Sequence, residues 1–150
     1  MQLSLHADYA LRVLIYLGTH PGRVIPTQEI SSAYAISKNH LVRVVHTLQS
    51  HGYLDIHAGR AGGLTLALPP QSIRLGDVIR HSEPNLRLVE CFDQQTNTCP
   101  IAPVCGLKGM LNEALLAFLD SLNRYTLADI TSKQGKKLAS AFATFVGWNG

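Results

Sequence analysis

The three cysteines of the chain are the residues best suited to chemistry, and all three fall within fifteen residues of one another. Seven residues separate Cys91 from Cys99, and five separate Cys99 from Cys105. Pro100 and Pro103 keep the last interval out of a helix. The thiols therefore come from an irregular loop, and thiolates are the ligands that soft metals and iron–sulfur clusters require.

Three interpretations of this cysteine loop remain open. Free cysteines can pack as small hydrophobic side chains, although all of these cluster in one polar loop. Structural zinc sites favour close cysteine pairs and four ligands, and neither is present. The third interpretation is an iron–sulfur cluster with one ligand that is not cysteine, and the spacing favours it. Cys105 directly precedes a helical pattern, whose N-terminal dipole would favour a thiolate.

The composition indicates a folded protein with apolar surface to cover. Of the 150 residues, 46% are hydrophobic and 15% are charged, against about 25% charged in an ordinary domain. The net charge of +3 permits an anionic partner without requiring one. The N-terminus lacks the pattern of a signal peptide and no apolar run approaches the ~20 residues of a membrane span. We therefore expect a cytoplasmic protein without membrane association, whose cysteines are thiols or metal ligands.

Three helices are expected before residue 50. The first covers residues 5–17 with Ser4 as its N-cap. The second starts at Thr27, taken as an N-cap after Pro26, and breaks near residues 35–36. The third starts at Ser37, another good cap.

The third helix carries the pattern of a DNA-reading helix. Its apolar residues recur at helical spacing and should pack inward. The opposite face and first turn carry amide and basic groups, namely Lys38, Asn39, His40, Arg43 and His46. Asparagine can pair with adenine and arginine with guanine in the major groove. Taken alone, this face is equally compatible with a simple solvated surface.

A β-hairpin after the third helix favours the DNA-binding interpretation. Residues 53–57 and 64–68 alternate like strands, and a glycine-rich tip with Arg60 lies between them. This order is that of a winged helix-turn-helix, in which Arg60 would reach a phosphate or the minor groove. We expect a mainly α fold with a small β-hairpin wing.

The chain divides into three expected regions. Residues 1–70 form the DNA-binding domain, residues 71–105 a linker helix and the cysteine loop, and residues 106–150 a dimerisation helix and a C-terminal helix. The dimerisation helix has a broad apolar stripe that a second copy would cover. A homodimer would then read a pseudo-palindromic operator in double-stranded DNA. Residues 126–130 are expected to close this stripe, and a last helix carries Leu138, Phe142 and Phe145.

Several segments together resemble the NsrR-type nitric-oxide-sensing iron–sulfur winged-helix repressors. The resemblance covers residues 1 to about 130 and rests on the three cysteines and on residues 1–3, 8–12, 37–42, 59–63, 73–78, 105–108 and 125–129. It implies a homodimeric repressor of nitric oxide detoxification genes. It also implies a cluster held by Cys91, Cys99 and Cys105, with an oxygen ligand from the partner subunit that maps onto Asp8. The wide gap after Cys91 leaves the cluster type open, with [4Fe–4S] preferred over [2Fe–2S].

The expected function is therefore transcriptional repression that ends when nitric oxide nitrosylates the cluster and DNA is released. The main alternative is an iron-free repressor of the same fold that responds to thiol redox state or to a metabolite. An enzyme is not expected, because no acid–base or nucleophile constellation surrounds the cysteine loop.

Overall fold

The computed structural model describes residues 2–148 of the chain, and side-chain surroundings up to residue 144. In this range the structure contains six α-helices, two short 3-10 helices and one two-stranded antiparallel sheet. The elements in order are α1 (Leu5–Gly18), α2 (Thr27–Tyr34), α3 (Lys38–Ser50), β1 (Leu54–His57), β2 (Gly63–Leu66), η1 (Pro70–Ser72), α4 (Leu75–Ser82), η2 (Glu90–Phe92), α5 (Leu107–Leu122) and α6 (Leu127–Trp148). The expected mainly α fold with a β-hairpin is confirmed.

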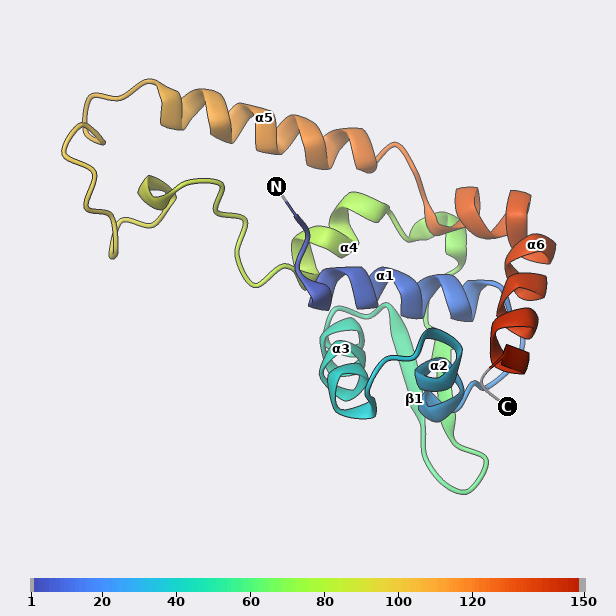
Figure 1. Cartoon of the computed structure of the whole chain (residues 1–150). Helices are drawn as coiled ribbons and strands as arrows, with labels where there is room; N and C mark the ends of the chain where they lie inside the picture. The colour runs from blue at the N-terminus through green and yellow to red at the C-terminus, as the bar shows by residue number, and fades with distance from the viewer. Residues whose placement is uncertain (1, 149–150) are drawn as a thin grey trace.

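The elements form a winged helix with a long arm, which consists of α5 and the loop between α4 and α5. In Figure 1, α1 crosses the middle of the molecule, with α2, α3 and the hairpin below it and α4 above it. The loop between α4 and α5 extends away from α1, and α5 runs back above α4 toward α6. The long helix α6 packs at the opposite end, against α1, α2 and η1.

Side-chain caps start two of the three N-terminal helices, as the sequence predicts. The Ser4 hydroxyl accepts a hydrogen bond from the Ala7 amide at 3.1 Å, and Ser37 accepts from the His40 amide at 3.4 Å. The prediction for α2 is wrong, because Thr27 is its first helical residue and Pro26 is the N-cap. Pro26 has an extended backbone with φ −60° and ψ 138°, and no side chain caps this helix.

The turn between α2 and α3 is held by a left-handed residue and a buried hydroxyl. Ala35, the C-cap of α2, has a φ of 52°. The Ser31 hydroxyl donates a 2.6 Å hydrogen bond to the carbonyl of Ile36 and is buried. This turn sets the angle at which α3 leaves α2.

The hairpin pairs Leu54 with Leu66 and His57 with Gly63. Both strands are shorter than the predicted ranges 53–57 and 64–68. A short bridge between Ile25 and Leu64 adds a third segment to this sheet. A Cβ atom on Gly63 would lie 2.5 Å from the carbonyl atoms of Ile25, so this close approach requires glycine.

One hydrophobic core joins the winged helix to its neighbours. Its buried members are Ala10, Val13, Leu14, Tyr16, Leu17, Ile25, Ile30, Ala33, Ile36, Leu41, Val44, Val45, Leu48, Tyr53, Leu54, Leu64, Ile73, Val78 and Leu127. Phe142 of α6 packs against this core. The expected inward packing of Phe142 is therefore confirmed, whereas the Phe145 side chain lies outside the described residues.

The α5–α6 junction is fastened to α4. The Asn123 side chain accepts a hydrogen bond from the Asp77 amide and donates one to the Asp77 carboxylate, both at 2.9 Å. The Leu127 amide donates to the Ile73 carbonyl at 2.9 Å. Residues 127–130 thus form the first turn of α6 rather than an end to the preceding stripe, and the helix break lies at residues 123–126.

Candidate nucleic-acid interface and metal centre

The amphipathic helix α3 separates core residues from the predicted DNA-reading residues. Leu41, Val44, Val45 and Leu48 are buried. The five predicted contact residues are all exposed, namely Lys38, Asn39, His40, Arg43 and His46. The structure therefore presents amide, imidazole, ammonium and guanidinium groups on one accessible helix, which is the chemistry that reads base edges and phosphates.

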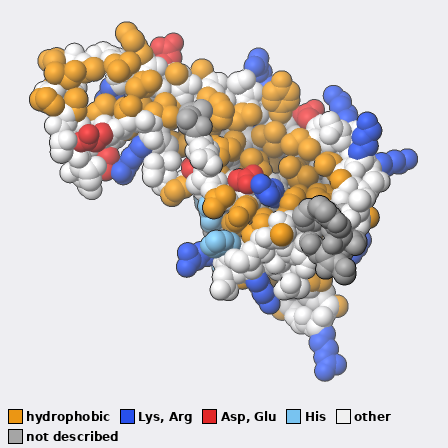
Figure 2. All heavy atoms as spheres, in the orientation of Figure 1, with side chains coloured by type: hydrophobic (Ala, Val, Ile, Leu, Met, Phe, Trp, Pro, Cys, Tyr) orange, Lys and Arg blue, Asp and Glu red, His pale blue; other side chains and the backbone are white. Residues whose placement is uncertain are grey.

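Arg60 lies in the turn of the hairpin and is exposed. Gly59 adopts a φ of 99°, and a Cβ on Gly62 would lie 2.5 Å from the His57 carbonyl oxygen. The turn therefore needs both glycines. In Figure 2 a basic side chain projects at the lower end of the molecule, where Figure 1 places the tip of the hairpin.

A cleft joins the hairpin to the first turns of α2 and α3. Its volume is about 290 Å³, and its lining includes Pro26, Thr27, Lys38, His57 and Gly63. No side chain caps α2, the Glu29 amide donates to the Pro26 carbonyl at 2.9 Å, and the first turn of the helix lies at this cleft. A helix N-terminus beside a lysine is suited to a phosphate. Sequence analysis missed this feature, although Pro26 was a usable signal.

A second hollow connects α3 to the helix that carries Asp8. It measures about 210 Å³ and is lined by Leu5, His6 and Tyr9 of α1 together with His40 and Arg43 of α3, among others. The Tyr9 and His40 ring centroids are 6.2 Å apart. A movement of the first turns of α1 would therefore reach two of the predicted DNA-reading side chains.

The three cysteines all lie on the arm, as free and half-buried thiols. Cys91 is in η2. The Cys99 amide donates a hydrogen bond to the Asn97 side chain at 3.1 Å. Cys105 directly precedes the N-cap of α5. The loop is thus an irregular segment between two helices, as predicted.

Two acidic residues organise the loop around the cysteines. The Thr98 hydroxyl donates to Glu90 at 2.7 Å, and bonds from Thr98 hold the pKa of the Glu90 carboxyl below its usual range. Asp93 accepts from the Thr96 hydroxyl and the Gln95 amide, which lower its pKa, and forms a 2.6 Å ion pair with Arg87. Both carboxylates therefore stabilise the loop itself.

The donor set fits an iron–sulfur cluster by type, with three thiols on one loop. However, no group of three or more His, Cys, Asp or Glu side chains within the described residues is close enough to hold a metal ion. The structure therefore gathers the cysteines on one segment but does not bring them into a single ligand set. Asp8 likewise joins no such set with the cysteines of its own chain.

Asp8 occupies the first turn of α1 and has a nearby cationic partner. Its carboxylate lies 2.7 Å from the Arg12 guanidinium, with each side chain about two-fifths exposed. The guanidinium carbon of Arg12 also lies 5.7 Å from the ring centroids of Tyr9 and Tyr34. Sequence analysis identified Asp8 but not Arg12, although their four-residue spacing on a helix indicates an ion pair.

The helix α5 is apolar on surfaces that the chain itself does not cover. Only Leu115 and Leu119 are buried, against α4. Met110 is 68% exposed, and Val104 in the preceding loop is 87% exposed. Figure 2 shows hydrophobic side chains covering the end of the arm. An exposed apolar surface of this kind marks a candidate interaction site.

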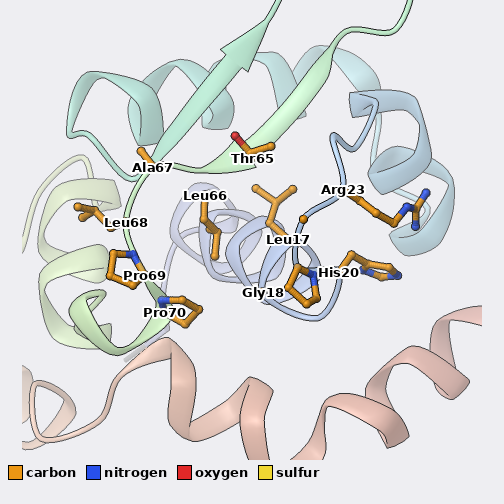
Figure 3. A pocket seen from close by; sticks show the side chains of 12 residues that line it. Leu17, Gly18, His20, Arg23, Thr65, Leu66, Ala67, Leu68, Pro69 and Pro70 are labelled. Atoms are coloured by element: carbon orange, nitrogen blue, oxygen red, sulfur yellow. The ribbon is translucent and has the colours of Figure 1, made fainter.

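The hollow at the base of the hairpin contains none of the predicted site residues. It measures about 410 Å³. In Figure 3, Leu17 and Leu66 approach it from α1 and β2, while His20 and Arg23 lie at one end and Pro69 and Pro70 at the other. Arg23 is paired with Glu29 at 3.2 Å. We assign this hollow no chemistry.

The exposed α3 face and the hairpin define a winged helix-turn-helix protein with an added cysteine-bearing arm. Residues 3–133 match the model of the Rrf2 family, described as iron-dependent transcriptional regulators. The chain belongs to this family, which contains transcriptional regulators rather than enzymes. That membership agrees with the expectation that the chain is not an enzyme.

Three relatives illustrate the range of the similarity. The chain is 46% identical over 135 residues to the HTH-type transcriptional regulator NsrR of Bacillus subtilis, covering 89% of this chain and 92% of that protein. It resembles the structure of T. potens IscR with a TM-score of 0.70 and 22% identity, over 89% and 88% of the two chains. It also resembles CymR, the global cysteine regulator of B. subtilis, with a TM-score of 0.65 and 26% identity, over 89% and 98%.

These comparisons confirm the resemblance to NsrR-type regulators. In the part of the chain that the structure describes, no helix has both the length and the apolar composition needed to cross a membrane.

Proposed function

We propose that this chain is a dimeric, cytoplasmic DNA-binding repressor that senses nitric oxide through an iron–sulfur cluster. The observation that carries the proposal is the position of the cysteine loop. All three thiols lie between α4, which packs on the winged helix, and α5, which has an uncovered apolar surface. A change in this loop therefore acts on the DNA-reading unit and on the dimer helix together.

DNA binding is supported by the exposed set on α3 and by Arg60. The side chains of α3, including Asn39 and Arg43, would read base edges in the major groove. Arg60 and the cleft beside α2 would contact the phosphate backbone. These contacts divide recognition into a sequence-dependent part on the helix and a sequence-independent part on the hairpin.

A homodimer is supported by the uncovered surface of α5 and the loop before it. A second copy related by a two-fold axis would bury the same residues on both chains. The two α3 helices would then face half-sites about 34–36 Å apart on a pseudo-palindromic operator.

The residues that would hold the cluster are Cys91, Cys99 and Cys105, with Asp8 supplied by the partner subunit. We prefer [4Fe–4S] over [2Fe–2S]. When bound, the cluster supplies iron that reacts with nitric oxide. The protein would contribute the carboxylate of Asp8, which lies 2.7 Å from the Arg12 guanidinium of its own chain. Release of Asp8 to Arg12 would alter the first turns of α1, beside His40 and Arg43.

The test is an anaerobic gel-shift titration with nitric oxide, using promoter DNA that the protein binds. We expect the gas to weaken binding of the wild-type protein severalfold or more, since coupling between sites is typically 5–150-fold. The variant Cys99→Ser should be poor in iron and insensitive to the gas. DNA affinity that does not change with nitric oxide in the iron-loaded wild-type protein would contradict the proposal.

A second candidate function is an iron-free repressor that responds to thiol redox state or to a cysteine-derived metabolite. The structural likeness to CymR, described as a global cysteine regulator, favours this alternative. Colour separates the two candidates. Protein purified without oxygen is brown with visible charge-transfer absorption if it holds a cluster, and colourless with full DNA affinity if it does not.

A further inference from the structure

Two histidines stack where the recognition helix meets the hairpin and α4. The ring centroids of His51 and His81 are 4.4 Å apart and their planes differ by 16°, so the rings lie face to face. His51 is the C-cap residue of α3, and His81 lies in the last turn of α4. The pair therefore connects the helix that carries the DNA-reading residues to the helix that leads into the cysteine loop.

Hydrogen bonds fix the orientation of both rings. The Nδ1 atom of His51 lies 2.9 Å from the carbonyl oxygen of Thr47. A carbonyl only accepts, so this nitrogen carries the proton. The Nδ1 atom of His81 lies 2.8 Å from the hydroxyl of Tyr53, whose buried ring lies just before β1. His81 thus contacts α3 through the stack and the hairpin through Tyr53.

The surroundings of His81 set its response to protons. The titratable and charged groups that face it are His51 from α3, Tyr53 from the hairpin, and Asp77 and Arg80 from α4. Both histidines are exposed residues, and partial desolvation, followed by the neighbouring His51 ring, lowers the pKa of His81. Each ring lies at a helix C-terminus, which favours a cation, but two stacked cations repel each other.

Helices α1 and α5 also pack against α4, and neither adds an opposing charge to the His51–His81 pair. From α1, His6 is occupied with the Thr47 hydroxyl at 3.0 Å. From α5, the neutral Asn123 side chain binds Asp77. Asp77 is therefore fastened to the dimer helix as well as lying near His81.

We propose that the His51–His81 stack is a proton-sensitive joint that positions the recognition helix α3 against α4. With no more than one proton added to the pair, the rings remain stacked and the C-terminus of α3 is held. A second proton separates the rings and releases that end of α3. Because Asp77 and Asn123 fasten α4 to α5, the joint lies on the physical path from the dimer helix to the DNA-reading face. This inference rests on the proposed DNA-binding function.

The sign of the pH effect on folding follows from the direction of the shift. The pKa of His81 is lower in the folded chain than in the unfolded one, so the unfolded chain takes up the proton first as the pH falls through about 6.5. The joint therefore contributes fully to stability above that pH and loses its contribution below it.

The first experiment compares DNA affinity at about pH 7.5 and about pH 5, because the lowered pKa of His81 places its protonation below the ordinary histidine range. The probe is the duplex that the full-length wild-type protein enriches from a random-sequence library at the higher pH. His81→Phe keeps an aromatic ring in the stack but cannot take up a proton. His20→Gln is the matched control, because His20 is outside the joint and outside the predicted DNA contacts.

We expect acidification to weaken the wild-type protein about fivefold relative to His81→Phe, a typical lower value for coupling between sites. His20→Gln should follow the wild type. The DNA-facing residues are the same in all three proteins, so the comparison isolates the joint. Parallel pH profiles for the wild type and His81→Phe would overturn the proposal.

A second experiment uses the unmodified chain and needs no DNA. The imidazole resonance of His81, assigned with His81→Phe, should titrate below the ordinary histidine range, and amide resonances of residues 47–50 should move with it. Titration of His81 near the ordinary value, with no movement of these amides, would overturn the joint. A chain that enriches no duplex at either pH would instead contradict the proposed function, and the resonances would still decide on the joint.

Discussion

Arginine occupies two different positions on the DNA-facing side, and each position has its own chemistry. Arg43 lies on α3, a helix of the size that enters a major groove, where a guanidinium can pair with a guanine. Arg60 lies on a glycine-rich turn, where it would meet the backbone or the minor groove. One residue should therefore affect sequence preference and the other overall affinity.

We expect Arg43→Ala to cost about 1–3 kcal/mol on the preferred operator and to relax the preference at one base position. Arg60→Ala should weaken all sequences alike and reduce the salt slope of log affinity by about 1. Fluorescence anisotropy with operator and scrambled duplexes at several salt concentrations measures both effects. The same pattern for the two variants would show that the assigned roles are wrong.

In the proposed function, the Asp8–Arg12 pair would let Asp8 act as an exchangeable ligand. Both side chains are partly exposed, and such pairs contribute only about 0–1 kcal/mol. Leaving Arg12 would therefore cost Asp8 little. The guanidinium carbon lies 5.7 Å from the ring centroids of Tyr9 and Tyr34, and these cation–π contacts would keep Arg12 in place to accept the carboxylate again.

At the scale of the elements, α4 packs against α1, α3 and α5. Gly76 is the point at which α4 most closely approaches α5. A Cβ atom at Gly76 would lie 2.4 Å from the Leu119 carbonyl oxygen and 2.6 Å from the Asn123 side chain. Backbone atoms of α5 cannot move aside without shifting the helix. The contact between α4 and α5 therefore depends on a missing side chain.

Gly76→Ala should destabilise the protein by about 1–3 kcal/mol through overpacking, measured by urea unfolding. The matched control is Gly135→Ala in α6, where a Cβ meets nothing within 4 Å. That change should be neutral or stabilise the helix by about 0.5–1 kcal/mol. Equal effects of the two substitutions would show that the α4–α5 contact does not depend on this glycine.

Local chemistry predicted most of the elements. Ser4 and Ser37 were found as caps because a hydroxyl before an apolar helical pattern has few other roles. Thr27 was misassigned because Pro26 takes the cap position through its own fixed backbone. The break at residues 123–126 was misplaced because Asn123 is used by Asp77, a partner 46 residues away that no local pattern reveals.

The candidate site was predictable by residue type but not by arrangement. The exposed face of α3 follows directly from helical spacing. The Asp8–Arg12 pair also follows from the four-residue spacing of the two residues on α1. By contrast, the sequence carries no signal for the stack of His51 on His81, because that contact is set by how α3 packs against α4. The ligand set of our proposal likewise includes a residue from a second chain.

At the scale of the whole molecule, the arm formed by α5 and the loop before it exposes the apolar surface that the proposed dimer would cover. The substitution Met110→Asp places a charge on its most exposed apolar helical residue. We expect this variant to sediment as a monomer and to lose about a hundredfold in operator affinity, because two linked heads bind far more tightly than one. Desolvating the new carboxylate in the interface is the physical cause.

Asn112→Asp is the matched control for this prediction, since it adds the same charge to an exposed polar position of the same helix. It should remain dimeric and bind the operator normally. A dimeric Met110→Asp variant with full affinity would contradict the proposed interface and require another surface for assembly.

The exposed apolar surface of the arm also has a consequence for the amount of this protein in the cell. A newly made single copy exposes Val104 and Met110 on an extended segment, which is the kind of target that proteases and chaperones capture. In the proposed dimer a second copy would hide that segment, so the lifetime of the protein would rise with its own concentration. A cell that makes only a few copies would degrade them, whereas copies above a threshold concentration would persist. This would make the change from a free promoter to a repressor-bound promoter steeper.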